Sequence, residues 1–224
     1  MTSLIDITHT VSQHLKVFPG DTAFSRDILM DMARGDHITL STIRSTVHLG
    51  THADAVSHYG RDGATMEAMP LDLYLGPCRV IDVSDRATAS RSARLAPSGA
   101  RRRVSITDLG EAPIDAERVL LRTDSAIDPQ RWHEHFLGLE PALVDHLADR
   151  GARLIGVDTP SVDTADSKDL PAHARCLARG VAIVEGLALA RVHPGRYEFI
   201  GLPLKLDGCD ASPIRAVLRT IGPA

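Results

Sequence analysis

The chain has 224 residues and a formal net charge of −4 at pH 7, a size that suits one domain with a sizeable core. Its basic residues gather into no dominant stripe, so nothing requires nucleic acid or an anionic membrane surface as a partner. No apolar run reaches the roughly 18 residues of a membrane span, and we expect a small molecule as the partner.

The cysteines and the first residues indicate the compartment. Cys78, Cys176 and Cys209 are widely spaced and form no C-x-x-C pair, a pattern typical of reduced, buried thiols rather than of a disulfide framework. Residues 1–6 lack the basic region and the apolar core of a secretory leader. We therefore expect a cytoplasmic protein that is not exported.

The first elements are short. A strand is expected over residues 4–11, then a turn at Phe18-Pro19-Gly20-Asp21, where proline presets one dihedral and glycine accepts a positive one. Phe18 is a candidate pocket wall; the alternative is an anchor between turn and core. Residues 26–34 fit a short helix or an irregular arm. Residues 38–47 alternate apolar and polar side chains, which predicts a half-buried strand.

The next stretch carries the strongest chemical signal. His48, His52, Asp54 and His58 are spaced by four, two and four residues, and histidine and carboxylate are common ligands of zinc and manganese. Four residues of strand span about 13 Å, whereas the ligands of one zinc ion lie about 2 Å from it. His48 and His52 therefore share an ion only if the chain bends, and Gly50 permits that bend. We expect a strand that ends in a tight, ligand-bearing loop.

The rest of the chain predicts alternating strands and helices, and hence an α/β fold without a linker or an internal repeat. Residues 85–117, rich in Ser, Ala and Arg, show no period and predict a solvated excursion with a short helix. Asp210-Ala211-Ser212-Pro213 is interpreted as the start of a helix over 214–218. The other expected elements are strands over 78–83, 118–123, 153–158, 181–185 and 197–202, and helices over 141–150 and 170–179.

A catalytic metal site needs further ligands from elsewhere, because such sites combine several protein groups with an open position. His173, in a predicted helix, and Glu185, which closes an apolar strand, are the best candidates. Glu185 is the stronger candidate of the two, because a carboxylate at the end of an apolar strand has to be exposed, paired with a cationic group or bound to a metal. Other polar residues fit turns, caps and ion pairs: Asp158, Asp163, Lys168 and Asp210. The remaining histidines lack a partner at ligand spacing and are expected to be surface or structural: His9, His14, His37, His133, His135, His146 and His193.

The motif His48-x-Gly50-Thr51-His52-x-Asp54-x-x-x-His58 resembles the signature of the metal-dependent cyclase family and of its bacterial kynurenine formamidase branch. The resemblance implies a single domain with a swivelling β/β/α fold, in which helices flank a mixed sheet, and a homodimer. Outside residues 85–117 it extends over nearly the whole chain, through Phe18-Pro19-Gly20-Asp21-Thr22, Val119-Leu120-Leu121-Arg122-Thr123, Gly156-Val157-Asp158-Thr159-Pro160-Ser161, Ala172-His173, Glu185-Gly186 and Asp210-Ala211-Ser212-Pro213.

The resemblance also implies roles for single residues. In the family, one metal ion is held by the residues that match His48, His52 and Asp54. A second ion is held by that same aspartate together with the residues that match His173 and Glu185. The residue that matches His58 is the proton donor and acceptor. Two divalent ions per subunit, zinc or else manganese, are therefore expected.

The implied reaction is the hydrolysis of an aryl formamide, N-formyl-L-kynurenine, to formate and L-kynurenine. Phe18 stands where the branch usually carries the tryptophan that lines the aryl pocket, and Val56 stands where it usually carries proline. Phe18 still stacks on an aromatic ring, with less area and no indole N–H. Two alternatives stay open: hydrolysis of another aryl or cyclic amide, as in the isatin hydrolases that the motif also resembles, and a non-catalytic metal-binding protein with a closed ligand shell.

Overall fold

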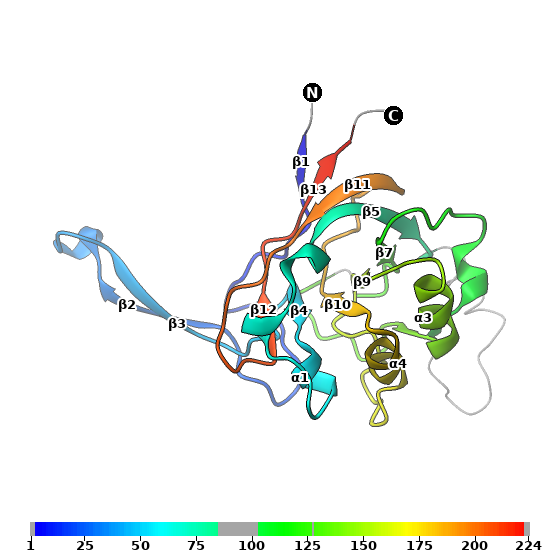
Figure 1. The fold of residues 1–224 in the computed structure, drawn as a ribbon. Helices are drawn as coiled ribbons and strands as arrows, with labels where there is room; N and C mark the ends of the chain where they lie inside the picture. Colours follow the sequence, from blue (N-terminus) through cyan, green and yellow to red (C-terminus); the bar gives the residue numbers. More distant parts are fainter. Residues whose placement is uncertain (1–2, 85–102, 127, 222–224) are drawn as a thin grey trace.

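The computed structural model describes residues 3–84, 103–126 and 128–221, and a nine-stranded mixed sheet forms its body (Figure 1). The central strands β5, β7, β9 and β10 run parallel, and the strands on either side pair antiparallel. The predicted α/β class with a mixed sheet is therefore confirmed. In spatial order the strands are β1 (Leu4–Asp6), β13 (Val217–Thr220), β11 (Gly195–Ile200), β5 (Leu75–Asp82), β7 (Arg118–Arg122), β9 (Leu154–Val157), β10 (Ala182–Glu185), β4 (His52–Asp54) and β12 (Ala211–Pro213).

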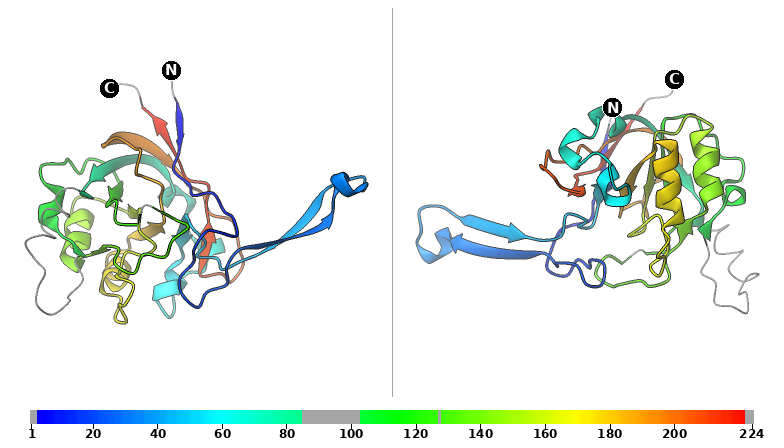
Figure 2. Two further views of the ribbon diagram at one scale, coloured as in Figure 1. Left: turned by 180° about the vertical axis from the view of Figure 1, so that it is seen from behind. Right: turned by 60° about the horizontal axis from the view of Figure 1, so that its bottom comes forward.

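Two helices, α3 (Pro141–Ala148) and α4 (Pro171–Arg179), cover one face of this sheet (Figure 2). Leu121 on β7 shares a buried cluster with Leu143 and Cys176 of these helices. Its neighbour Leu120 belongs to a second buried cluster, together with Phe199 of β11. The central strands are thus buried on both faces, which explains why they appear in the sequence as continuous apolar runs.

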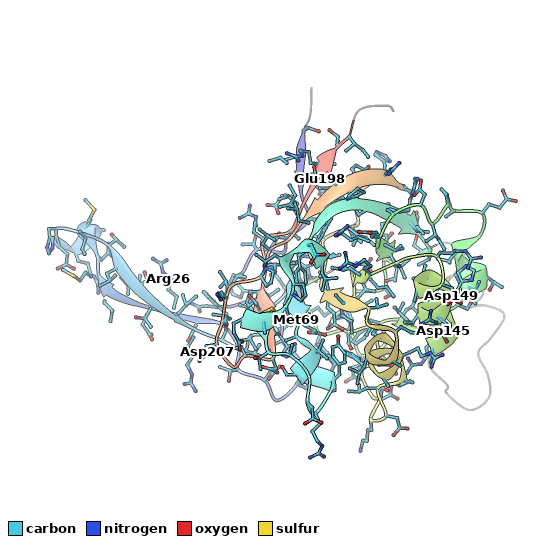
Figure 3. The ribbon with its side chains drawn as sticks, in the orientation of Figure 1. Arg26, Met69, Asp145, Asp149, Glu198 and Asp207 are labelled. Carbon is cyan, nitrogen blue, oxygen red and sulfur yellow. The ribbon has the colours of Figure 1, made fainter. Side chains whose placement is uncertain are left out.

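Ion pairs hold α4 against α3. Oδ1 of Asp145 accepts hydrogen bonds from Arg175 Nε (2.7 Å) and Arg179 Nη1 (2.8 Å). Asp149, the residue that follows α3, accepts another from Arg179, and Figure 3 labels Asp145 and Asp149. Exposed pairs of this kind contribute only about 0–1 kcal/mol each. Their effect here is to orient α4, the helix that carries His173.

Short elements fill the connections. The strand expected over residues 4–11 ends at Asp6, and Thr8 forms only an isolated bridge with Leu187. Residues 85–102 of the expected excursion lie outside the described residues. Residues 103–117 hold β6 and a 3-10 helix that starts with a capping box. The bounds of the short elements are α1 Val56–Tyr59, β6 Arg103–Val104 and β8 Gly138–Leu139, with 3-10 helices at Met32–Arg34, Met66–Ala68, Leu71–Leu73 and Ile106–Leu109.

A two-stranded hairpin projects from the body (Figures 1 and 2). It consists of β2 (Ser25–Met30) and β3 (Leu40–Arg44), so a helix over residues 26–34 is wrong and the strand expected over 38–47 is shorter. That strand is also not half-buried: Ile43 is 65% exposed and Leu40 is 45% exposed. The alternating pattern is that of a strand with one face to cover, but the hairpin leaves the body and the single chain offers no cover.

The helix expected over residues 214–218 is wrong. These residues follow β12, which pairs with β4, and lead into β13, which lies between β1 and β11. A five-residue segment with four apolar side chains fits a strand or a helix equally well by periodicity. Pairing with strands from the other end of the chain decides between them.

No helix in the described part of the chain is long and apolar enough to cross a bilayer.

Candidate active site

The histidine segment bends at Gly50, whose φ of +57° lies in the left-handed region that favours glycine. The order of elements differs from the prediction. His48 lies in the loop before the bend, His52 and Asp54 lie on β4 after it, and His58 lies on α1. The bend returns His48 to the side of Asp54, with 3.2 Å between His48 Nδ1 and Asp54 Oδ1.

Two residues from the second half of the chain reach the same point. β10 pairs with β4 so that Glu185 lies opposite His52, and Glu185 Oε2 is 3.4 Å from His52 Nε2. His173, in the first turn of α4, places its Nε2 3.6 Å from Asp54 Oδ2 and 3.6 Å from Glu185 Oε1. The structure therefore brings the five residues predicted as metal ligands into one cluster.

Asp54 lies fully buried at the centre of this cluster. Its Oδ1 faces His48 and His52, and its Oδ2 faces His173. Neither oxygen has a hydrogen-bond partner within the described structure, and neither does Nε2 of His52 or of His173. Buried polar atoms nearly always have partners. Converging imidazole and carboxylate atoms without partners fit a divalent cation between them, because this donor set suits zinc and manganese.

Each histidine of the cluster is held through its other ring nitrogen. Metal-binding histidines typically have this second nitrogen fixed by a carboxylate or a carbonyl group. The contacts leave Nδ1 of His48 and Nε2 of His52 and His173 facing the cluster. The distances are 3.0 Å from His48 Nε2 to Asp210 Oδ2, 3.0 Å from His52 Nδ1 to the Gly50 carbonyl oxygen, and 2.9 Å from His173 Nδ1 to Asp163 Oδ2.

Asp163 is itself tightly held. It accepts hydrogen bonds from the backbone N–H groups of Ala172 and His173 and from Arg103 Nη1. Burial works against its charge, but the hydrogen bonds from His173 and Arg103 prevail and lower its pKa to about 2. An ionised Asp163 thus fixes both the start of α4 and the orientation of the His173 ring, a role that the interpretation as a turn or cap residue describes only in part.

The charges in the cluster favour a cation at its centre. Burial alone lowers the pKa of His52, but the Asp54 and Glu185 carboxylates, each 3.4 Å from its Nε2, outweigh burial and raise that pKa to about 10. Burial is likewise outweighed at His173, where contacts with Asp163 and Asp54 raise the pKa to about 10. The buried carboxylates therefore need positive charge beside them, supplied either by protonated imidazoles or by bound metal ions.

His58 lies at the edge of the cluster, and its side chain is 33% exposed. Its ring centroid is 4.2 Å from that of His48, and its Nδ1 is 3.5 Å from Asp210 Oδ2. Asp210, in the loop before β12, is anchored by a 2.9 Å hydrogen bond from Ala55 N–H to its carbonyl oxygen. The sequence interpretation of Asp210 as a helix cap missed these contacts. The one available signal was its place in a block that resembles the family.

The cluster borders a cavity of about 570 Å³, within the usual range for small-molecule sites. Phe18, for which a pocket wall and a core anchor were the two interpretations, lines this cavity, and so does Trp132, which the sequence did not single out. Their ring centroids lie 4.8 Å apart at an angle of 65°. His9 and His133, expected to be surface or structural, also line the cavity. Their segments are far from the motif in sequence, so spacing gave no sign of them.

Comparisons with known proteins place the chain in a family. A family model described as putative cyclase matches residues 5–164. The chain belongs to this cyclase family. It is 41% identical over 219 residues to the kynurenine formamidase of Salinibacter ruber, with 97% of both chains covered.

Solved structures of similar proteins share the cyclase-family fold. A potential metal-dependent hydrolase with cyclase activity is 27% identical, with a TM-score of 0.79 over 100% of both chains. Isatin hydrolase A from Ralstonia solanacearum is 22% identical and has a TM-score of 0.81, covering 98% of this chain and 92% of that one. The second likeness shows the fold alone. The expected family and cyclase-like fold are thus confirmed.

Gly186 lies close against Gly50, the residue at which the histidine segment bends, and this contact gives a stability prediction. Gly186 has a φ of +63°, and a Cβ there would lie 2.1 Å from the carbonyl oxygen of Gly50. We expect Gly186→Ala to lower the free energy of unfolding by at least about 2 kcal/mol, because a strained backbone and a clash add. The control Gly151→Ala, with a φ of +88° and open space around it, should cost only about 1 kcal/mol. Equal losses in urea unfolding would contradict this account.

Proposed function

We propose that the protein is a kynurenine formamidase, which hydrolyses N-formyl-L-kynurenine to L-kynurenine and formate. The observation that carries the proposal is a cavity that joins a buried histidine and carboxylate cluster to aromatic side chains. The cluster suits activation of water and of an amide carbonyl group, and the aromatic rings suit an aryl substituent. The 41% identity to a kynurenine formamidase over 97% of both chains supports this choice of amide.

The cluster is proposed to hold two divalent metal ions, zinc with manganese as the alternative. His48, His52 and Asp54 would hold one ion, and Asp54, His173 and Glu185 the other. The two oxygens of Asp54 face different histidines, which supports a bridging role, since a carboxylate has two oxygens to offer. Bound there, the ions would polarise the formyl oxygen and activate a water molecule.

The side chains around the cluster have separate tasks in this mechanism. His58 accepts a proton as water attacks the formyl carbon, and donates a proton to the aryl nitrogen as the C–N bond breaks. Asp210, within 3.5 Å of His58 Nδ1, holds the imidazole in place for both transfers. Phe18 packs against the aryl ring of the substrate. The products are formate and a neutral aryl amine, and the one remaining proton is released to solvent, so atoms and protons balance.

A parallel assay tests the proposal. Purified protein is given N-formyl-L-kynurenine and isatin, before and after treatment with a chelator. We expect faster hydrolysis of the formamide, its loss after chelation, and its return with zinc. Faster hydrolysis of isatin would favour the cyclic-amide alternative, and hydrolysis of neither would overturn the proposal. A non-catalytic metal protein is disfavoured because the cluster borders an open cavity rather than a closed ligand shell.

We also propose a homodimer in the cytoplasm. Apolar side chains on the projecting hairpin support association, because they lack cover in the single chain: Ile28, Leu29, Met32, Ile38, Leu40 and Ile43. Free thiols at Cys78, Cys176 and Cys209 support a reducing compartment. The mass of a monomer in light scattering would overturn the proposed homodimer. Recovery of the protein outside the cytoplasmic fraction of cells would overturn the proposed location.

A further inference from the structure

An aromatic cluster forms part of the cavity wall. The Trp132 ring lies 4.8 Å from that of Phe18 and 6.0 Å from that of Phe136, with edge-to-face angles of 65° and 86°. Phe136 is only 1% exposed and anchors the cluster in the body. Trp132 and Phe18 are half-buried and line the cavity. The indole borders the cavity and not only the core, so it offers apolar surface to a ligand that enters there.

Backbone hydrogen bonds fix the segment that carries Trp132. Lys16 N–H donates to the carbonyl oxygen of Pro129 (2.9 Å) and so ties this segment to the one that carries Phe18. The turn is closed by a 3.2 Å hydrogen bond from Arg131 N–H to the carbonyl oxygen of Asp128. With the segment fixed in this way and the indole packed against Phe18 and Phe136, the site is ordered before a ligand arrives, which lowers the entropy cost of binding.

We propose that Trp132 determines the specificity of this site for substrates whose amide carries an aromatic ring. This inference rests on the proposed hydrolysis of an aryl formamide. A flat aromatic ring gains an edge-to-face or offset contact with the indole beyond the simple burial of area, and a saturated ring of similar size gains only the burial. Phe18 and Trp132, edge-on to each other, supply two adjoining aromatic surfaces in the same cavity.

The test compares two ligands that cannot be hydrolysed and that match in size, acetophenone and cyclohexyl methyl ketone. Calorimetry measures their dissociation constants for the metal-loaded protein and for its Trp132→Ala and Trp132→Phe variants. We expect Trp132→Ala to weaken acetophenone binding about tenfold and cyclohexyl methyl ketone binding by no more than about threefold. Trp132→Phe should retain most of the aromatic preference. Equal weakening of both ligands, or of neither, overturns the inference.

Two further measurements separate this inference from the proposed function. Trp132 is the only tryptophan of the chain, so acetophenone should change the protein's indole fluorescence saturably and with the calorimetric midpoint. In turnover of N-formyl-L-kynurenine, Trp132→Ala should raise KM about tenfold with little change in kcat. Normal turnover by the wild type with an unchanged KM in Trp132→Ala overturns the role of Trp132 alone. Aromatic preference without any formamide hydrolysis overturns the proposed function and leaves the cavity's preference standing.

Discussion

Replacing His58 by alanine is expected to lower kcat by about a hundredfold or more while the metal ions stay bound. The departing aryl nitrogen would then have to leave as an anion, which is a far poorer leaving group than the neutral amine. His58 Nδ1 faces Asp210, outside the group of proposed ligands, so its loss should spare the metal. Steady-state kinetics with N-formyl-L-kynurenine and metal analysis of the same preparation check both parts of this expectation.

A competing interpretation makes His58 a metal ligand, because Asp54, His58 and His173 also present atoms within 4.8 Å of one another. That interpretation predicts loss of metal from His58→Ala. The exposed His193 provides a control, and His193→Ala should keep both turnover and metal. Full turnover by metal-loaded His58→Ala would remove His58 from the mechanism.

Asp210→Asn tests the positioning of His58 separately. The amide keeps the shape of the side chain and removes the charge beside the imidazole, so we expect kcat to fall about tenfold with KM nearly unchanged. Asp210 also contacts His48, and metal content must therefore be measured in the same preparation. Unchanged kcat in a metal-loaded Asp210→Asn protein would show that His58 needs no such partner.

The proposed ligands could be found from the sequence because their signals are local. The spacing from His48 to Asp54 required a bend, and Gly50 adopts the left-handed conformation that makes one. Glu185 ends an apolar strand that the structure buries on both sides, and it is only 4% exposed. A charge in such a place requires a partner whatever the fold. The strand order that sets Glu185 opposite His52 came only with the structure.

Other features depend on contacts between segments far apart in the sequence, and no local sequence pattern indicates them. Asp210 precedes a proline and a mostly apolar segment, so a helix cap was the natural interpretation. Its carboxylate nevertheless contacts His48 and His58, which are more than 150 residues away in sequence. Trp132 contacts Phe18 where a backbone hydrogen bond joins their segments, which lie more than 100 residues apart in sequence. The hairpin strands show ordinary strand periodicity, which does not reveal whether a core lies beneath them.

The shared role proposed for Asp54 leads to different metal stoichiometries in two variants. Asp54→Ala should lose both ions, with affinity falling by more than the roughly 10–100-fold typical when a residue that only supports a ligand is changed. Glu185→Ala should lose one ion and keep the other at His48, His52 and Asp54. Plasma mass spectrometry of dialysed protein gives the number of ions per chain for each variant.

Asp54 and Glu185 form an informative pair because both are buried carboxylates, 0% and 4% exposed. Both also contact His52 and His173. Removal of either one deletes a buried charge, so a general effect of charge on the fold would act on both variants alike. Asp62→Ala, an exposed carboxylate on a nearby loop, should retain both ions. Since only a bridging ligand couples the two positions, one ion retained by Asp54→Ala would mean that the ions are held independently.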